Sequence, residues 1–408
     1  MHNLSISPRL ARLRLALAFF GFALVGLSGG AMGVLLPSIG NFYRVNNAVL
    51  GLLFLVSSGG YFLSAFCTGL LSERLGQRAF LIVGALTFAG GYLLFGLQPP
   101  FFLVLLARLL SGFGAGIIET GLNVYIAALP RSAALLNHLH AYFGVGSLVG
   151  PLIAGSVLAL GWDWNVVFVV FAILGMVLLS GFVLLFDAVQ LGDQAQSTSK
   201  ESALGATLRT GAVWLAALFL LVYVGVEVSL GNWSFSYLLT ARHIDTLAAG
   251  WMVSGLWLGL TLGRFVLENI AERFGVGPGG LMYLCMAGLV LGIGVIWALP
   301  FEAAAAIGLF FVGLSLGPIY PLTVALTPRL VPAQLAASTI GFIVSASIIG
   351  LALFPWLAGI LIQFAGSWSL LPFILGLTGI MGIFWQYTTR LLAKAPLSAM
   401  VEVQNEKV

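Results

Sequence analysis

Long apolar stretches separated by short polar or Pro/Gly breaks dominate the chain. The stretches are about 20 residues or more in length, which is what a helix needs to cross a bilayer, and they lack the short alternating pattern of barrel strands. Because a backbone in lipid must satisfy its own hydrogen bonds, they predict transmembrane helices. The predicted helices span residues 15–39, 49–72, 79–97, 101–128, 134–160, 164–186, 211–239, 247–270, 279–299, 302–326, 335–363 and 369–391.

This pattern predicts an all-α membrane protein with twelve transmembrane helices in two pseudo-symmetric six-helix bundles. The sequence Glu73-Arg74-Leu75-Gly76 after the second helix recurs as Glu272-Arg273-Phe274-Gly275 after the eighth, 199 residues later. Repeated halves that move about a central site are a known architecture of secondary transporters. The expected organisation is an N-terminal bundle over 1–186, a cytoplasmic linker over 187–210, a C-terminal bundle over 211–393 and a cytoplasmic tail over 394–408.

The distribution of basic residues predicts the orientation. When loops are assigned alternately to the two sides, most of the 17 basic residues fall on the side that contains the termini. The other side receives only Arg44 and Arg242, while Arg108 and Arg264 lie within helices. By the positive-inside rule both termini are expected in the cytoplasm, and the protein in the plasma (inner) membrane.

Composition excludes several classes of protein. With 60% hydrophobic and 7% charged residues, the chain has too little polar surface for a water-soluble globule. The net charge of +4 is not gathered into a basic cluster, so no nucleic-acid partner is expected. Cys67 and Cys285 fall in different halves and predict neither a disulfide nor a metal site. No phosphate loop, metal-spaced cluster or nucleophile elbow is present, so we expect no catalytic residue, no enzyme activity and no cofactor beyond a coupling ion.

Two motifs resemble the major facilitator superfamily. The stretch from Gly69 to Arg78, Gly-Leu-Leu-Ser-Glu-Arg-Leu-Gly-Gln-Arg, is similar to the family's loop signature, with Glu73 where Asp is usual and Ala79 where a second base often follows. The fourth helix carries Arg108 followed by Gly112 and Gly114, which resembles the family's helix 4 motif. The resemblance covers the whole chain and implies a transporter.

A finer resemblance points to the fucose/galactose/glucose cation symporter branch, which includes sodium-dependent glucose carriers. It rests on Glu119 with Asn123 four residues on, and on the helix 5 stretch from His138 to Gly146, His-Leu-His-Ala-Tyr-Phe-Gly-Val-Gly. One departure concerns coupling. The proton-coupled fucose members carry an acid before an Ile-Leu-Leu-Pro stretch of helix 1, whereas Gly33 precedes Val34-Leu35-Leu36-Pro37 here.

Ionisable side chains inside the predicted helices are the first functional candidates, because each costs several kcal/mol in the hydrocarbon core, roughly 2.5 to 3.5 for a central Arg or Asp. Glu119 and Glu227 are expected to bind both substrate and the coupling cation, H⁺ or Na⁺. The resemblance places their helices, the fourth and seventh, around one aqueous chamber. A buried ion pair or a helix-helix hydrogen bond is the structural alternative for Glu119.

Further substrate-binding candidates are polar or aromatic side chains near that chamber. Trp233 suits either an apolar platform for a sugar ring or an interfacial anchor, and the anchor is favoured for Tyr237. His138 and His140 cannot share a helix face, so at most one should point at substrate, and a histidine satisfied near the cytoplasmic end is the favoured alternative. The remaining candidates are Tyr61, Asn123, Asn137, Asn232, Trp257 and Tyr320, the last beside the helix-breaking Pro318 and Pro321.

A second set of charged residues is expected to act in gating. Glu73, Arg74 and Arg78 are expected to form a cytoplasmic latch, and Arg108 to give structural or coupling support. Arg264 and Glu268 lie four residues apart on one helix and predict an intrahelical pair that gates or latches the bundles.

The favoured function is cation-coupled symport of a small polar solute, with a monosaccharide as the preferred class, by a monomer in the lipid bilayer. Residues Gly146 to Gly155 also resemble a glycine-proline motif of drug/proton antiporters, so export of amphipathic compounds is the first rival. Close packing of helices through small residues explains that motif equally well. A receptor or scaffold that does not transport is the second rival.

Overall fold

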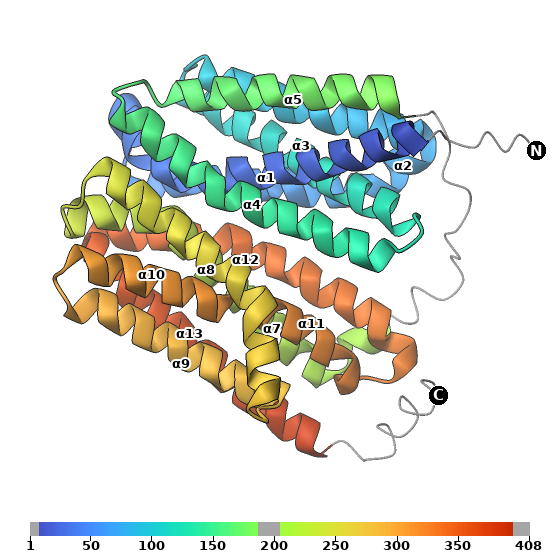
Figure 1. The fold of residues 1–408 in the computed structure, drawn as a ribbon, viewed down its shortest axis with the longest axis vertical. Coiled ribbons are helices and arrows are strands. Elements are labelled where there is room, and N and C mark those ends of the chain that lie inside the picture. Colours follow the sequence, from blue (N-terminus) through green and yellow to red (C-terminus); the bar gives the residue numbers. More distant parts are fainter. Residues whose placement is uncertain (1–7, 187–204, 395–408) are drawn as a thin grey trace, which may run out of the picture.

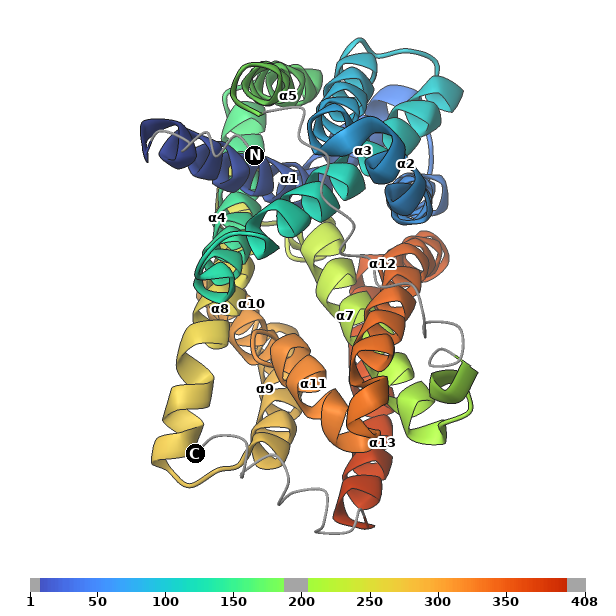
Figure 2. The same cartoon turned by 90° about the vertical axis from the view of Figure 1, so that its right-hand side faces the viewer.

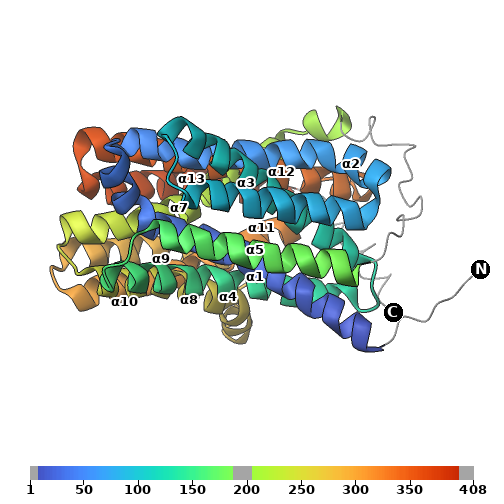
Figure 3. The same cartoon turned by 90° about the horizontal axis from the view of Figure 1, so that it is seen from above.

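In the computed structural model, which describes residues 8–186 and 205–394, the chain is helical throughout apart from its loops. Twelve helical stretches of this described part are long and apolar enough to cross a membrane, as predicted. They form two bundles, drawn in Figure 1 from blue to green and from green to red. Figure 3 shows that the helices of both bundles run between the same two ends of the molecule.

The N-terminal half contains five helices that make six spans: α1 (Pro8–Tyr43), α2 (Asn47–Gly96), α3 (Phe101–Ala127), α4 (Ser132–Ala159) and α5 (Asn165–Leu185). Helix α2 supplies two of these spans, Asn47–Ala65 and Arg74–Gly96. They join through Gly76, whose φ of 73° is one that residues with a Cβ rarely adopt.

The C-terminal half contains α7 (Gly211–Ala241), α8 (Thr246–Arg273), α9 (Pro278–Ala298), α10 (Glu302–Leu316), α11 (Ile319–Leu326), α12 (Ala336–Ala365) and α13 (Leu370–Lys394). Short 3-10 turns, η1 (Thr327–Leu330), η2 (Ala333–Leu335) and η3 (Ser367–Ser369), connect them. Helices α10 and α11 with η1 form a single span that breaks at Pro318, which has no N–H to continue the α10 hydrogen bonds.

The internal repeat seen in the sequence is also present in the backbone. Gly275 has a φ of 69°, which matches Gly76 at the equivalent place in the other half. The N-cap of α2 is Asn46 and that of α8 is Asp245, again 199 residues apart, and each side chain accepts hydrogen bonds from the first turn of its helix. The two halves therefore share local conformation as well as helix order.

Close helix crossings hold each half together. A Cβ built at Gly60 of α2 would lie 2.1 Å from the carbonyl oxygen of Leu109 in α3. One at Gly259 of α8 would lie 2.1 Å from that of Phe310 in α10. At these two crossings only glycine leaves room for the neighbouring backbone. Small residues are common at helix crossings in membrane proteins for the same reason.

The two halves meet through α1 with α7, α2 with α12 and α4 with α8 (Figure 2). A Cβ built at Gly33 of α1 would lie 2.6 Å from Cα of Asn232 in α7, and one at Gly155 of α4 would lie 3.2 Å from Cα of Gly250 in α8. Both contacts fall toward the end of the bundle opposite the described chain ends, so the halves are closed together at that remote end. The cytoplasmic side of the termini stays a prediction, and most of the predicted linker and tail lie outside the described residues.

Candidate functional site

Glu119 lies toward the middle of α3 and faces α2. Its Oε2 accepts a hydrogen bond of 2.6 Å from the phenol of Tyr61. Within the described part of the chain, no basic side chain forms an ion pair with this carboxylate. A partly buried acid with a hydrogen-bond donor but no cationic partner is suited to take up a cation.

Glu227, at the centre of α7, does have a cationic partner. Its Oε1 lies 3.9 Å from a terminal guanidinium nitrogen of Arg264 in α8, and the two side chains keep 15% and 31% of their accessible surface. The pair is therefore loose and partly solvated. The Nε–H group of Arg264 is buried without an acceptor among the described residues, so this guanidinium can make a further hydrogen bond.

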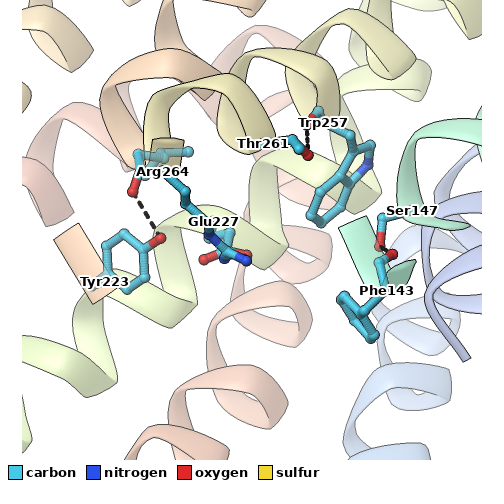
Figure 4. A network of polar contacts seen from close by, with 8 residues as sticks. Phe143, Ser147, Tyr223, Glu227, Trp257, Thr261 and Arg264 are labelled. Atoms are coloured by element: carbon cyan, nitrogen blue, oxygen red, sulfur yellow. Dashed lines mark hydrogen bonds and ion pairs between the residues drawn. The ribbon is translucent and has the colours of Figure 1, made fainter. Parts of the chain in front are cut away.

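Two tyrosines surround the Glu227–Arg264 pair. The phenol of Tyr223, one turn before Glu227 on α7, donates to the carbonyl oxygen of Leu316 at 3.0 Å, at the break between α10 and α11 (Figure 4). The ring of Tyr320 lies 6.3 Å from that of Tyr223. Tyr320 interacts electrostatically with Glu119 as well as with Glu227, so the structure brings the acids of both halves toward one central region.

Trp257 and Thr261 extend this region along α8. Thr261 donates to the carbonyl oxygen of Trp257 at 2.9 Å, and the indole points from α8 toward Ser147 and Phe143 of α4 (Figure 4). Trp257, Thr261 and Arg264 recur at helical spacing and so lie on one face of α8. That face looks across the boundary between the halves.

Trp233 does not fit either expectation from the sequence. Its side chain is fully buried, and its indole N–H donates to the carbonyl oxygen of Pro355 in α12 at 2.8 Å. Its ring lies between Gly359 of α12 and Phe54 of α2 in the other half, with no surface accessible to a sugar ring or to the membrane interface. Tyr237 is also buried, so the interfacial role expected for it is wrong as well.

The asparagine and histidine candidates are placed less centrally. Asn232 is buried where α7 meets Gly33, and its amide donates to Val228 of its own helix at 2.9 Å. His138 is exposed and hydrogen-bonds through Nδ1 to the carbonyl oxygen of Ala134 at 2.6 Å, as the satisfied-histidine alternative anticipated. Asn137 is exposed beside it, whereas Asn123 is partly buried one turn from Glu119.

The predicted Arg264–Glu268 pair is wrong, because Arg264 pairs with Glu227 and Glu268 is exposed. Arg264 points into the bundle, where an acid on the neighbouring helix lies within reach. Glu268 is nearer in sequence but does not pair with Arg264, because its side chain faces outward.

The other gating candidates lie within the N-terminal half. Arg78 donates to the carbonyl oxygen of Val183 at 2.5 Å, near the end of α5, rather than across the boundary between the halves. Arg108 is buried, and its guanidinium donates to the hydroxyls of Tyr92 and Ser111 at 3.4 Å each. Arg74 is exposed, and the side chain of Glu73 is outside the described part of the structure.

Sequence reasoning overlooked Tyr223 and did not single out His140 as the inward-facing histidine. Tyr223 precedes Glu227 by four residues and so shares its helix face, a signal that was present in the sequence. His140 interacts electrostatically with Arg264 of the other half and packs edge-on against Phe22 at 5.4 Å. The proximity of His140 to a residue of the other half has no local sequence signal.

The structure consists of two helical bundles with a few charged side chains between their helices. Comparison with known proteins leads to the same kind of protein. The sequence profile described as Major Facilitator Superfamily matches residues 18–344. The chain belongs to the major facilitator superfamily. A major facilitator protein is a multi-pass membrane transporter, so the predictions of a carrier and of no enzyme activity are confirmed.

Relatives within the superfamily are similar over most of the chain. The chain is 25% identical to "Bypass of stop codon protein 6" of Saccharomyces cerevisiae, over 88% of this chain and 78% of the relative. It is 23% identical to the "Glucose/mannose transporter GlcP" of Bacillus subtilis, over 71% of each. The major facilitator fold is shared with a bacterial homologue of the human lysosomal transporter Spinster, in an inward-facing and unoccupied conformation, with a TM-score of 0.79, 14% identity, and coverage of 96% of this chain and 99% of that one.

Proposed function

We propose that this protein is a cation-coupled symporter of a monosaccharide that works by alternating access. The observation that carries the proposal is Glu119, a carboxylate inside the bundle with a phenol donor and no ion-pair partner among the described residues. An uncompensated charge in such a place is costly, so the carboxylate is expected to be neutralised by a bound H⁺ or Na⁺ during the cycle.

We assign coupling to Glu119 and not to Glu227. Arg264 already neutralises Glu227, so binding a second cation there would meet a neighbouring positive charge. This assignment narrows the sequence-based expectation that both acids bind the coupling ion. Glu227 and Arg264 remain candidates for binding substrate, because both keep accessible surface.

A sugar is the solute that best suits these groups. Carboxylates accept hydrogen bonds from hydroxyls, while the guanidinium, phenols and indole of the region donate to hydroxyl oxygens. Polyols need both kinds of partner, whereas lipophilic cations need an aromatic cage. A relative with the printed name glucose/mannose transporter supports the same substrate class.

The contacts between the halves support an alternating-access cycle. With the termini in the cytoplasm, the closed end at Gly33 and Gly155 is the outer one. The glycine crossings inside each half favour movement of whole bundles about the central site, as in other transporters with repeated halves.

The antiporter alternative gains no support from its glycine-proline motif. A Cβ built at Gly146 would lie 2.0 Å from the carbonyl oxygen of Ala23, and one at Gly150 would lie 2.4 Å from that of Leu27. Packing of α4 on α1 therefore accounts for these glycines without a role in export.

Transport by purified protein in liposomes tests the proposal. We expect counterflow of labelled D-glucose or another hexose, and its accumulation when an inward H⁺ or Na⁺ gradient is imposed. Proton-driven efflux of a hydrophobic dye without hexose counterflow would support the antiporter instead. Hexose binding without counterflow would indicate a receptor, and the symporter proposal would be rejected.

A further inference from the structure

The indole of Trp257 differs from the other central indole in its hydrogen bonding. Trp233 donates from Nε1 to a carbonyl oxygen at 2.8 Å, and Trp385 does so at 3.4 Å. The N–H of Trp257 is buried and has no acceptor among the described residues. Trp164 shares this property but lies in an aromatic cluster with Phe42 and Phe95 at the remote end.

An unpaired buried donor needs a physical explanation. Leaving an N–H group without an acceptor costs about 1–3 kcal/mol relative to leaving it in water. Native structures contain few such groups, and those that persist often mark a partner that is not part of the chain. Trp257 is accordingly a candidate to donate to a ligand.

The position of Trp257 fits a ligand at the central site. It lies seven residues before Arg264, two helical turns away on the same face of α8. Its indole edge packs on Gly231, where a Cβ would lie 2.6 Å from Cζ2, and its ring points toward α4 of the other half (Figure 4). The side chain is only partly buried as a whole, unlike that of Trp233.

The charges nearby make the donor chemically useful. Glu227 lies one helical turn before Gly231, on which Trp257 packs, and offers acceptor oxygens to the hydroxyl hydrogens of a solute. The unpaired N–H groups of Trp257 and Arg264 need acceptor oxygens. A sugar hydroxyl can donate its hydrogen to a carboxylate and accept an N–H hydrogen bond on its oxygen at the same time. An aromatic ring also packs well against the apolar C–H face of a pyranose.

We infer that Trp257 is a specificity-determining residue of the sugar site, with its indole N–H donating to one hydroxyl oxygen of the pyranose and its ring packing on the sugar. This inference rests on the proposed monosaccharide transport and names the residue that distinguishes one hexose from another. It gives the platform role to Trp257, whose side chain is partly accessible, rather than to the fully buried Trp233.

A combination of protein and sugar variants tests this inference. Binding of D-glucose and of each of its monodeoxy analogues is measured with purified wild-type protein, Trp257→Phe and Trp251→Phe. Phenylalanine keeps an aromatic ring but removes the N–H, and Trp251 is a matched control on the same helix with 61% of its side chain exposed. Counterflow in liposomes reports transport by the same three proteins.

We expect Trp257→Phe to weaken binding of D-glucose by about tenfold, while Trp251→Phe leaves it unchanged. One deoxy analogue should bind wild type and Trp257→Phe equally, because the hydrogen bond is absent from both of these complexes. A purely structural role would weaken all sugars alike, without a selective analogue, and would overturn the inference. So would a loss of transport with unchanged binding.

Failure of the two proposals can be told apart. If wild-type protein binds and transports hexose but Trp257→Phe matches it for every analogue, the inference about Trp257 is wrong and the proposed function stands. If wild-type protein neither binds nor transports any hexose, both are wrong.

Discussion

The phenol of Tyr61 donates a 2.6 Å hydrogen bond to the carboxylate of Glu119, which joins the first span of α2 to α3 in the interior of the N-terminal half. The other half holds Glu227 together with Arg264. One half thus presents an acid without a cation and the other an acid with one. This difference in charge between similar bundles is the basis of the predictions for the two acids.

Glu119→Gln should abolish cation-driven accumulation of the sugar while leaving exchange of labelled for unlabelled sugar in place. The amide keeps the shape of the side chain but carries no negative charge that a proton or a sodium ion could neutralise. Uptake into liposomes with and without an imposed gradient measures the two activities. Accumulation by this variant at the wild-type level would remove Glu119 from the coupling mechanism.

The Glu227–Arg264 pair should respond to a charge exchange. Each single reversal, Glu227→Arg or Arg264→Glu, leaves two like charges together, and we expect each to reduce sugar binding by about tenfold or more. The double variant restores opposite charges and should recover part of the loss. Binding measured in the full double-mutant cycle checks this, and strictly additive losses would contradict a direct interaction.

Gly33→Ala should disfavour closure of the remote end. Its Cβ would lie 2.6 Å from the Cα and the carbonyl oxygen of Asn232, and overpacking of this kind costs about 1–3 kcal/mol. Gly29→Ala on the same helix is the control, because a Cβ there meets nothing within 4 Å. Labelling of a cysteine at position 232 by an impermeant thiol reagent, in a background without Cys67 and Cys285, should increase in Gly33→Ala only. Equal labelling of both variants would show that the contact does not limit closure.

Trp233→Phe should lower stability and leave sugar selectivity unchanged. The substitution removes the hydrogen bond to the carbonyl oxygen of Pro355 inside the C-terminal half, at a cost of about 1–2 kcal/mol in the free energy of unfolding. The thermal midpoint of the purified protein should fall, while its ranking of deoxy sugars matches that of wild type. An altered ranking would bring Trp233 back as a binding residue.

The sequence allowed helix number, helix order and the repeat to be predicted, because these depend on local signals. Apolar length sets each span, and the recurrence at Gly76 and Gly275 follows from a turn that needs positive φ. Asn46 and Asp245 are likewise local helix caps.

Local signals do not predict the rotation of each helix about its own axis, which decides which side chains face the protein interior. In a soluble protein the apolar face of a helix identifies its buried side, but here lipid and protein interior are both apolar, so this signal is lost. The sequence therefore predicts Tyr237 at the interface although it is buried, and predicts Glu268 as the partner of Arg264 although Glu227 of another helix lies nearer. The charged residues of the site could be named, but their partners could not.

The glycine crossings at Gly60 and Gly259 have a practical consequence for reagents. Because the helices of each bundle pack backbone against backbone, each bundle should move as a rigid unit. An antibody fragment that binds a single bundle should move with it and leave the transport rate unchanged. A fragment whose epitope includes both α4 and α8, or both α2 and α12, would hold the two bundles in one arrangement and block transport. Screening for inhibitors should therefore select for footprints that span both bundles rather than for tight binding alone.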